Sequence, residues 1–142
     1  MRFPYRAAMN DANELLRSSM PLCATLDMRA VSASPEEVVL QIDWAESLCT
    51  SAGLLHGGVV MALADSAGGM AAFLNLPQGS TGTSTIESKT NFLGAVRDGT
   101  ITATARPLHV GRSTIVIETE LRADNGKLVA KTTQTQTVLR PR

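Results

Sequence analysis

The sequence is poor in the residues from which charged and aromatic binding surfaces are built. Aromatic side chains make up only 4% of the 142 residues, and 13 Lys and Arg are balanced by 13 Asp and Glu. The basic residues form no run. A nucleic-acid surface needs clustered basic residues and stacking aromatics, and an anionic membrane surface attracts basic segments. We therefore expect neither nucleic acid nor a membrane as a partner.

Cysteine and histidine are also scarce. Cys23 and Cys49 lie far apart without a CxxC spacing, and we expect them to be reduced core residues of a cytosolic protein. His56 and His109 fall in unrelated segments without an HExxH motif or a carboxylate cluster, so no metal site is expected. No GxSxG occurs, which leaves a serine-hydrolase triad unsupported. The N-terminal stretch MRFPYRAAMNDANELL lacks an apolar segment of signal-peptide length, and we expect a cytoplasmic location.

The length fits one domain, residues 1–142, with a helical N-terminal extension over residues 1–20. The segment NDANELLRSS predicts a helix over 10–19 with Asn10 or Asp11 as its cap. Alternating apolar residues predict two strands before residue 45 and about four after residue 82. The turns between them are predicted at Ser34–Pro35, Asp98–Gly99, Gly111–Arg112 and Asn125–Gly126. The Asn-Gly pair predicts a type I′ turn, which needs positive φ at both residues.

Between the two groups of strands lies LLHGGVVMALADSAGGMAAFLNL, residues 54–76, one of the most apolar runs in the chain. Residues 57–74 are helix-like, and a helix that is apolar on nearly every side must be buried on nearly every side. A membrane span is disfavoured because the run contains His56, Asp65 and four glycines. The order of strand, strand, long helix and four antiparallel strands predicts an α+β fold in which one curved sheet wraps the helix.

The polar residues and glycines of this run indicate a site. Gly57 and Gly58 occupy the expected first helical turn, whose N–H groups have no partners inside the helix and carry the positive end of its dipole. These groups suit a carbonyl oxygen that gains negative charge. His56 and Asp65, however, are half a turn and about 13 Å apart along one helix. If both serve one reaction, they must come from different chains related by a two-fold axis.

Structural explanations compete with a catalytic one for each of these residues taken singly. An Asp in an apolar helix is more often a hydrogen-bonded structural carboxylate. A His at a helix start is more often a cap or a surface residue, and small residues mostly mean close helix packing. The combination favours a site, because His-Gly-Gly, an apolar helix and Leu-Ala-Asp follow one another at fixed offsets.

The stretch HGGVVMALAD, residues 56–65, resembles the signature of hot-dog-fold acyl-CoA thioesterases. It is most similar to the phenylacetate-pathway (PaaI-like) branch of the 4-hydroxybenzoyl-CoA thioesterase superfamily. The following strands, IESKTNFLGAVRDGTITATARPLHVGRSTIVIETELRADNGKLVAKTTQT, resemble that branch too, so the likeness covers roughly residues 35–140. It implies a hot-dog fold, a long helix wrapped by an antiparallel sheet. It also implies homodimers, usually paired into tetramers, with active sites at the dimer interface.

By position, the resemblance implies hydrolysis of an acyl-CoA thioester, with CoA as part of the substrate and no further cofactor. Asp65 would act as a general base on water or as a nucleophile on the thioester carbon. The Gly57 N–H would polarise the thioester carbonyl, and His56 would orient the motif. Thr85 is the best match for a helper hydroxyl, because the position four residues after the acid is Gly69.

Further residues are implied in binding the substrate. Thr50 stands six residues before the histidine, where relatives more often have Asn or Gln. The turn in PLHVGRST offers a glycine, a cation and two hydroxyls along CoA, and Arg97 is a second candidate cation. A plain turn arginine is the alternative explanation for Arg112. The expected substrate- and CoA-binding set is Thr50, Gly58, Arg97, His109, Val110, Gly111, Arg112 and Ser113.

Two other functions compete with hydrolysis. A hot-dog hydratase or dehydratase would need a different catalytic segment, of which we find no counterpart. A non-catalytic acyl-CoA-binding module would keep the CoA-facing turn without needing Asp65, and the presence of that carboxylate favours an enzyme. The acyl group stays open between aryl, short and medium chains. Candidates to line its pocket, and equally to fill the core, are Ala67, Met70, Ala71 and Leu74.

Overall fold

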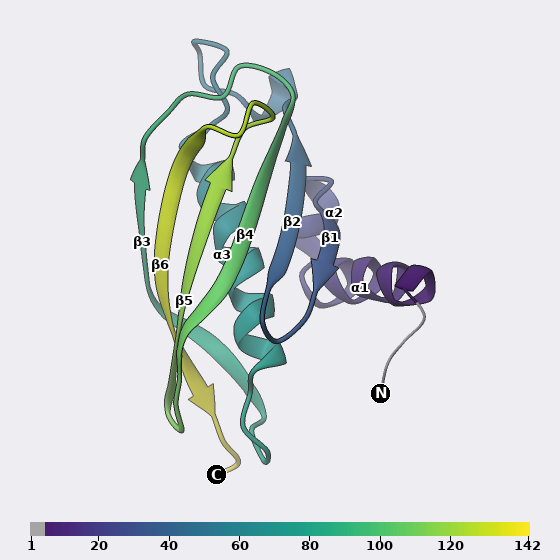
Figure 1. Cartoon of the computed structure of the whole chain (residues 1–142), viewed down its shortest axis with the longest axis vertical. Coiled ribbons are helices and arrows are strands. Elements are labelled where there is room, and N and C mark those ends of the chain that lie inside the picture. The colour runs from purple at the N-terminus through teal and green to yellow at the C-terminus, as the bar shows by residue number, and fades with distance from the viewer. Residues whose placement is uncertain (1–4) are drawn as a thin grey trace.

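The computed structural model describes residues 5–142, with side chains from residue 11 onward. One six-stranded antiparallel sheet curves around a long helix (Figure 1). The predicted α+β architecture is therefore confirmed. In chain order the elements are α1 (Tyr5–Ser19), α2 (Pro21–Thr25), β1 (Arg29–Ala33), β2 (Val38–Asp43), a 3-10 turn (Glu46–Leu48), α3 (Gly57–Leu74), β3 (Gly82–Phe92), β4 (Thr100–Val110), β5 (Thr114–Arg122) and β6 (Leu128–Leu139).

The sheet has the strand order β1-β2-β4-β5-β6-β3, so β1 and β3 are its two edges. Ile42 of β2 lies opposite Ile101 of β4, and β4, β5 and β6 follow as neighbouring hairpins. β3 leaves the end of α3 and pairs with the last strand, β6, which brings Thr85 opposite Gln136. Residues that are far apart in the sequence thus meet beside the helix.

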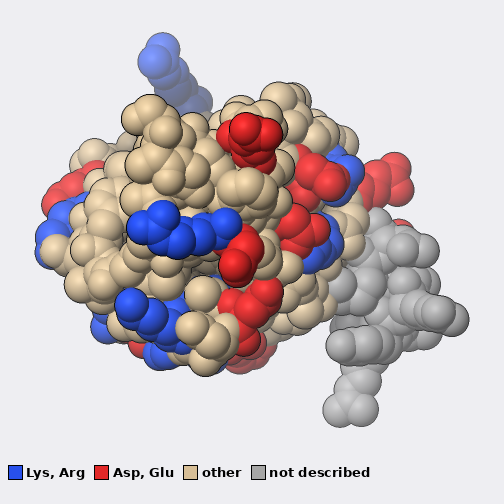
Figure 2. Space-filling view, turned by 90° about the horizontal axis from the view of Figure 1, so that it is seen from above, with Lys and Arg blue, Asp and Glu red and all other residues tan. Residues whose placement is uncertain are grey.

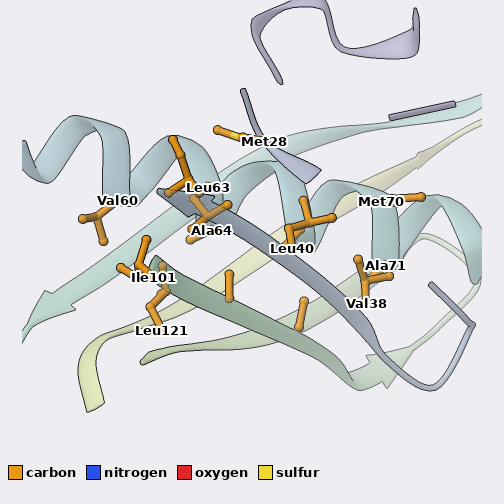
Figure 3. Packing of buried hydrophobic residues seen from close by; sticks show 14 of the residues in the cluster. Met28, Val38, Leu40, Val60, Leu63, Ala64, Met70, Ala71, Ile101 and Leu121 are labelled. Atoms are coloured by element: carbon orange, nitrogen blue, oxygen red, sulfur yellow. The ribbon is translucent and has the colours of Figure 1, made fainter. Parts of the chain in front are cut away.

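Helix α3 is the core of the molecule. Figure 3 shows its buried side chains packed with those of the sheet; the labelled members of this cluster are Met28, Val38, Leu40, Val60, Leu63, Ala64, Met70, Ala71, Ile101 and Leu121. Burying a leucine such as Leu63 stabilises the fold by about 1.5–3 kcal/mol. Among residues 5–142, α3 is the one helix long and apolar enough to cross a membrane by length and composition. Half of it is buried inside the protein, as in a core helix.

The N-terminal helix is longer than predicted. It begins at Tyr5, so Asn10 and Asp11 lie inside the helix and neither is its cap. The side chain of Asn13 joins α1 to β1, because its amide donates to the Ala30 carbonyl (3.2 Å) and its oxygen accepts from the Ala30 N–H (2.8 Å). The short helix α2, which the sequence analysis did not predict, continues this segment towards β1. The extension is therefore fastened to the edge of the sheet.

The hairpin between β5 and β6 forms at the predicted Asn125–Gly126 pair, but its turn is not type I′. Gly126 has φ +82°, whereas Asn125 is not among the described residues with positive φ. The Gly126 N–H donates to the Ala123 carbonyl (2.9 Å), and the Ala123 N–H donates to the Lys127 carbonyl (3.0 Å). This is a type I turn closed by a left-handed glycine. The prediction was wrong because a three-residue loop needs positive φ only once, and Asn125 instead accepts from the Lys127 N–H (3.0 Å).

A β-bulge interrupts β3 beside α3. Thr85 pairs with Gln136 and Glu87 pairs with Thr135, which leaves Ile86 as the extra residue. A bulge re-aims the side chains of its strand. Here Thr85 reaches a side chain of α3, while Ile86 is 63% exposed at the sheet edge.

Charges of both signs are mixed on the surface. Figure 2 shows basic and acidic side chains close together on the face seen from above. Several are paired, such as Arg29 with Asp43 (2.9 Å) and Arg122 with Glu120 (2.8 Å). The face in view carries no extended patch of a single sign.

Candidate active site

His56 is the N-cap of α3. Its backbone is extended (φ −62°, ψ 132°), and its Nδ1 accepts a hydrogen bond from the Gly58 N–H at 2.8 Å. A neutral ring that accepts at Nδ1 carries its proton on Nε2. The exposed His56 ring can therefore still donate outside the helix. The capping bond uses the Gly58 N–H, so Gly58, which we predicted in the substrate-binding set, offers no free amide.

Gly57 is the first residue of α3, and its N–H has no partner within the helix. A Cβ at this position would lie 3.3 Å from two ring atoms of Phe92. The aromatic ring thus packs directly on the helix start. Gly57, Phe92 and the predicted Thr50 line one pocket of about 370 Å³, which we call the helix-start pocket. The residue that carries this unpaired first-turn amide therefore lines the helix-start pocket.

Asp65 lies about two turns further along α3 and is exposed in the single chain. Its Oδ1 accepts hydrogen bonds from the Thr85 hydroxyl (3.1 Å) and from the Gln134 amide Nε2 (3.2 Å). Within the part of the chain that the structure describes, no hydrogen bond reaches Oδ2. The predicted helper hydroxyl of Thr85 therefore touches the predicted catalytic carboxylate.

The Asp65 carboxylate faces a second pocket of about 370 Å³ between α1, α3 and β3, which we call the acid pocket. Leu15 of α1 and Met70 and Phe73 of α3 give it apolar walls, and β3 lines it with hydroxyl side chains, of which Thr85 contacts the carboxylate. The volume is in the range of small-molecule sites. Of the four α3 residues predicted to line an acyl pocket, Met70 lines the acid pocket, whereas Ala67 and Ala71 are fully buried in the core and Leu74 packs against it.

Gly57 and Asp65 of one chain thus open into different pockets. They are separated by about 12 Å along the axis of α3. A carbonyl oxygen bound at the Gly57 N–H would be out of reach of the Asp65 carboxylate in the same chain. The continuous helix on which the sequence-based separation of His56 and Asp65 depends is present as α3, Gly57–Leu74.

The remaining predicted residues lie at the two ends of the sheet. Arg97 is exposed in the connection from β3 to β4, whereas residues 109–113 form the far end of β4 and the turn into β5 (Figure 1). The His109 ring packs over Gly111, where a Cβ would lie 2.5 Å from Nε2. Strand β4 spans about 33 Å between the two ends. One chain therefore cannot bring Arg97 and Arg112 to a single small ligand.

The sequence pattern of the thioesterase superfamily matches residues 52–130, more than half of the chain. The chain belongs to this superfamily. A 1,4-dihydroxy-2-naphthoyl-CoA hydrolase from Listeria monocytogenes is 31% identical over 110 residues, which cover 78% of this chain and 89% of that protein. The structure of a thioesterase from Haemophilus influenzae matches with a TM-score of 0.86 at 26% identity, over 99% of this chain and 93% of that one. A mutant thioesterase from Pseudomonas aeruginosa matches with a TM-score of 0.83 at 30% identity, over 89% and 93%. The hot-dog fold is thereby confirmed.

In this member of the thioesterase superfamily, two site residues that the sequence analysis missed lie on β6. Gln134 and Gln136 are each 1% exposed, and both face α3 or β3 with their amides. Gln134 donates to Asp65, and Gln136 donates to the Thr85 oxygen (2.7 Å). The segment KTTQTQT did contain a sign of this site. A strand whose inner face is covered normally has apolar residues at every second position, and this segment has glutamines there instead. Polar residues at alternate inward positions indicate a buried hydrogen-bond network.

Behind Asp65, on the buried side of α3, Cys23 meets Ser66. The Cys23 thiol donates to the Ser66 oxygen (3.4 Å), and the Ser66 hydroxyl donates to the Ala62 carbonyl (2.7 Å). Burial raises the pKa of the Cys23 thiol, and the Ser66 hydrogen bond opposes this more weakly. Cys23 is thus a buried core residue, as predicted, whereas Cys49 is only partly buried; both cysteines are free.

Proposed function

We propose that this thioesterase-superfamily protein hydrolyses the thioester bond of an acyl-CoA to a carboxylic acid and CoA. The observation that carries the proposal is the Asp65 carboxylate, held through one oxygen by Thr85 and Gln134 beside the largely apolar acid pocket. A fixed carboxylate with a free oxygen next to an apolar cavity suits attack on a carbonyl carbon that carries an acyl group. CoA is part of the substrate, and no further cofactor is required.

The oxyanion donor in this proposal is the Gly57 N–H of a second copy of the chain. Antiparallel α3 helices related by a two-fold axis would place Gly57 of one chain beside Asp65 of the other and make two equal sites. Strand β3 supports such pairing because it is an edge of the sheet, with hydrogen-bonding groups open to another strand. It also carries Ile86 and Phe92, which are 63% and 53% exposed. A dimer of dimers is the further assembly that we propose.

Two chemical routes use this arrangement. In the first, Asp65 takes a proton from water, the hydroxide adds to the thioester carbon, and the carbonyl oxygen gains negative charge at the Gly57 N–H. The C–S bond then breaks, and the CoA thiolate leaves and takes up the proton. In the second, a carboxylate oxygen of Asp65 forms an anhydride as the C–S bond breaks, and water hydrolyses the anhydride.

We assign the acyl group to the acid pocket. Its volume of about 370 Å³ and its walls of Leu15, Met70 and Phe73 suit an aryl or a short to medium acyl group. The likeness to the phenylacetate-pathway branch and the naphthoyl-CoA hydrolase relative favour an aryl group. For the CoA phosphates we propose Arg97 of one chain and Arg112 of its partner, because antiparallel chains bring opposite ends of the two sheets together. The proposed location is the cytoplasm.

Asp65→Asn tests the proposal in a thiol-release assay with phenylacetyl-, benzoyl-, acetyl- and hexanoyl-CoA. We expect wild-type turnover with at least one of them and a loss of about 10²- to 10⁴-fold in the variant, with an unchanged unfolding temperature. Asp11→Asn, on the exposed face of α1, is the matched control and should keep full activity. Binding of acyl-CoA by the wild type without any turnover would instead establish a non-catalytic binding module.

A further inference from the structure

The two oxygens of the Asp65 carboxylate differ in their hydrogen bonds. Oδ1 receives both hydrogen bonds, from Thr85 and from Gln134, while Oδ2 has no hydrogen bond from any described residue. We propose that Gln134 is a positioning residue which, together with Gln136 acting through Thr85, fixes Asp65 so that Oδ2 is the oxygen that reacts. This inference rests on the proposed function, in which Asp65 attacks or activates water.

The direction of each hydrogen bond follows from the chemistry of the groups. Oε1 of Gln136 lies against the Thr83 hydroxyl (3.0 Å), whose single proton is shared with the Thr137 carbonyl (2.9 Å). Nε2 of Gln136 then donates to the Thr85 oxygen (2.7 Å). An amide nitrogen can only donate, so the single hydroxyl proton of Thr85 is left for Asp65. Gln136 thus compels Thr85 to be a donor to the carboxylate.

The Gln134 amide is held in one orientation at a cost. Its Oε1 is buried and has no hydrogen-bond partner in the described part of the chain. Turning the amide over would bring Oε1 against the Asp65 carboxylate, so Nε2 must face Asp65 and Oε1 stays unpaired. A buried unpaired acceptor lowers stability, and an apolar side chain of the same shape would avoid that loss. Groups that cost stability are typical of sites where function requires them.

Gly68 makes the space for this amide. The three atoms nearest to a Cβ at position 68 all belong to the Gln134 amide, and the most distant of the three is only 2.9 Å away. A Cβ at the neighbouring Gly69 would meet nothing within 4 Å. The glycine at 68 therefore serves Gln134, since glycine in a helix interior is otherwise unfavourable. Asp65, Gly68 and Gln134 form one unit, although the first two lie on helix α3 and Gln134 lies on strand β6.

Gln134→Met tests the positioning role, because methionine fills a similar shape and removes both polar atoms. We expect kcat to fall about 10- to 100-fold with little change in KM, since a small misplacement of a catalytic group has effects of this size. The unfolding temperature should stay the same or rise, because the unpaired acceptor is gone. The control is Gln41→Met, whose amide donates to Thr102 (3.0 Å) away from the site, and it should keep full kcat. A kcat within about twofold of wild type, or a raised KM at unchanged kcat, would overturn the proposal.

A double-mutant cycle gives a second test that does not depend on Gln134→Met folding well. Gly68→Ala should displace the amide and lower kcat, and Gln134→Ala should lower it too. In the Gln134→Ala protein the extra methyl has space, so Gly68→Ala should cause no further loss and should raise stability. Losses that simply multiply in the double variant would show that Gly68 and Gln134 act separately, and the proposal would fail.

A crystal structure of Gln134→Met separates failure of this inference from failure of the proposed function. We expect the Asp65 carboxylate to leave its position against Thr85. An unmoved carboxylate would refute the positioning role, whatever the activity. A wild-type protein that hydrolyses no acyl-CoA, with a carboxylate that does move in the variant, would refute the proposed function and leave the positioning role standing.

Discussion

Gly57→Pro would remove a single N–H from the start of α3 while leaving the helix intact. Proline is favoured at the first helical position, where the N–H has no intrahelical partner and the fixed φ suits the helix. The preceding residue, His56, is already extended (φ −62°, ψ 132°), which is the conformation that a following proline requires. The substitution therefore acts on the proposed oxyanion donor more than on the fold.

We expect Gly57→Pro to lower kcat about 100- to 1000-fold, or about 2.7–4 kcal/mol, the typical loss for one oxyanion donor. Gly57→Ala is the matched control, because it adds a Cβ at 3.3 Å from the Phe92 ring but keeps the N–H. The Phe92 side chain is 53% exposed and can move slightly, so the alanine variant should keep most of its activity.

The assay is thiol release from the best acyl-CoA, with thermal unfolding to verify that both variants are folded. Equal activities of folded Gly57→Pro and Gly57→Ala proteins would show that the Gly57 N–H takes no part in the reaction.

The remaining predictions concern stability and reactivity. Leu63→Ala should lower the free energy of unfolding by about 2–5 kcal/mol in a urea titration, because Leu63 is fully buried. A smaller loss would mean that neighbouring side chains fill the space that the leucine leaves. Hydrogen bonds from Arg29 and then Thr100 lower the pKa of Asp43 below its usual 3.8, so its stabilising effect is present at higher pH and is lost as the pH falls through the lowered value. Asp43→Asn should thus cost less than about 1 kcal/mol at neutral pH, because the pair is largely exposed, and the difference from wild type should shrink as the pH falls through the lowered pKa of Asp43. Burial raises the pKa of the Cys23 thiol, so this thiol should react with Ellman's reagent only in urea, and rapid reaction in the native protein would contradict its core position.

The elements with strong apolar periodicity were predictable from the sequence. The alternation of Ile115, Ile117 and Leu121 places their side chains on one face of the sheet, where they are fully buried. The run at 57–74 forms a helix with the predicted bounds. Its residues are apolar on nearly every side, so the helix is stable only when the sheet covers it. The turn at Asn125–Gly126 was placed correctly but typed wrongly, since loop length decides the turn type and dipeptide preference does not reveal it.

Only the part of the site that lies within one short segment of the sequence was predictable. The motif identifies His56 and Asp65, and the capping bond of His56 to Gly58 is a two-residue interaction. The bond from Gln134 to Asp65 joins positions 69 residues apart, and the bond from Gln136 to Thr85 beside it depends on the register of β3 against β6. That register includes the bulge at Ile86, which strict alternation does not predict. Residues whose roles depend on strand register therefore become visible only in the structure.

In the proposed function, Asp65 of one chain and Gly57 of another form one active site. Co-expression of Asp65→Asn and Gly57→Pro chains with two different affinity tags would yield purified mixed dimers. In such a dimer, one site combines the intact Gly57 of the first chain with the intact Asp65 of the second, while the other site carries both substitutions. We expect mixed dimers to recover about half of the wild-type kcat per dimer, although each variant alone is nearly inactive. Mixed dimers as inactive as the two parents would contradict it.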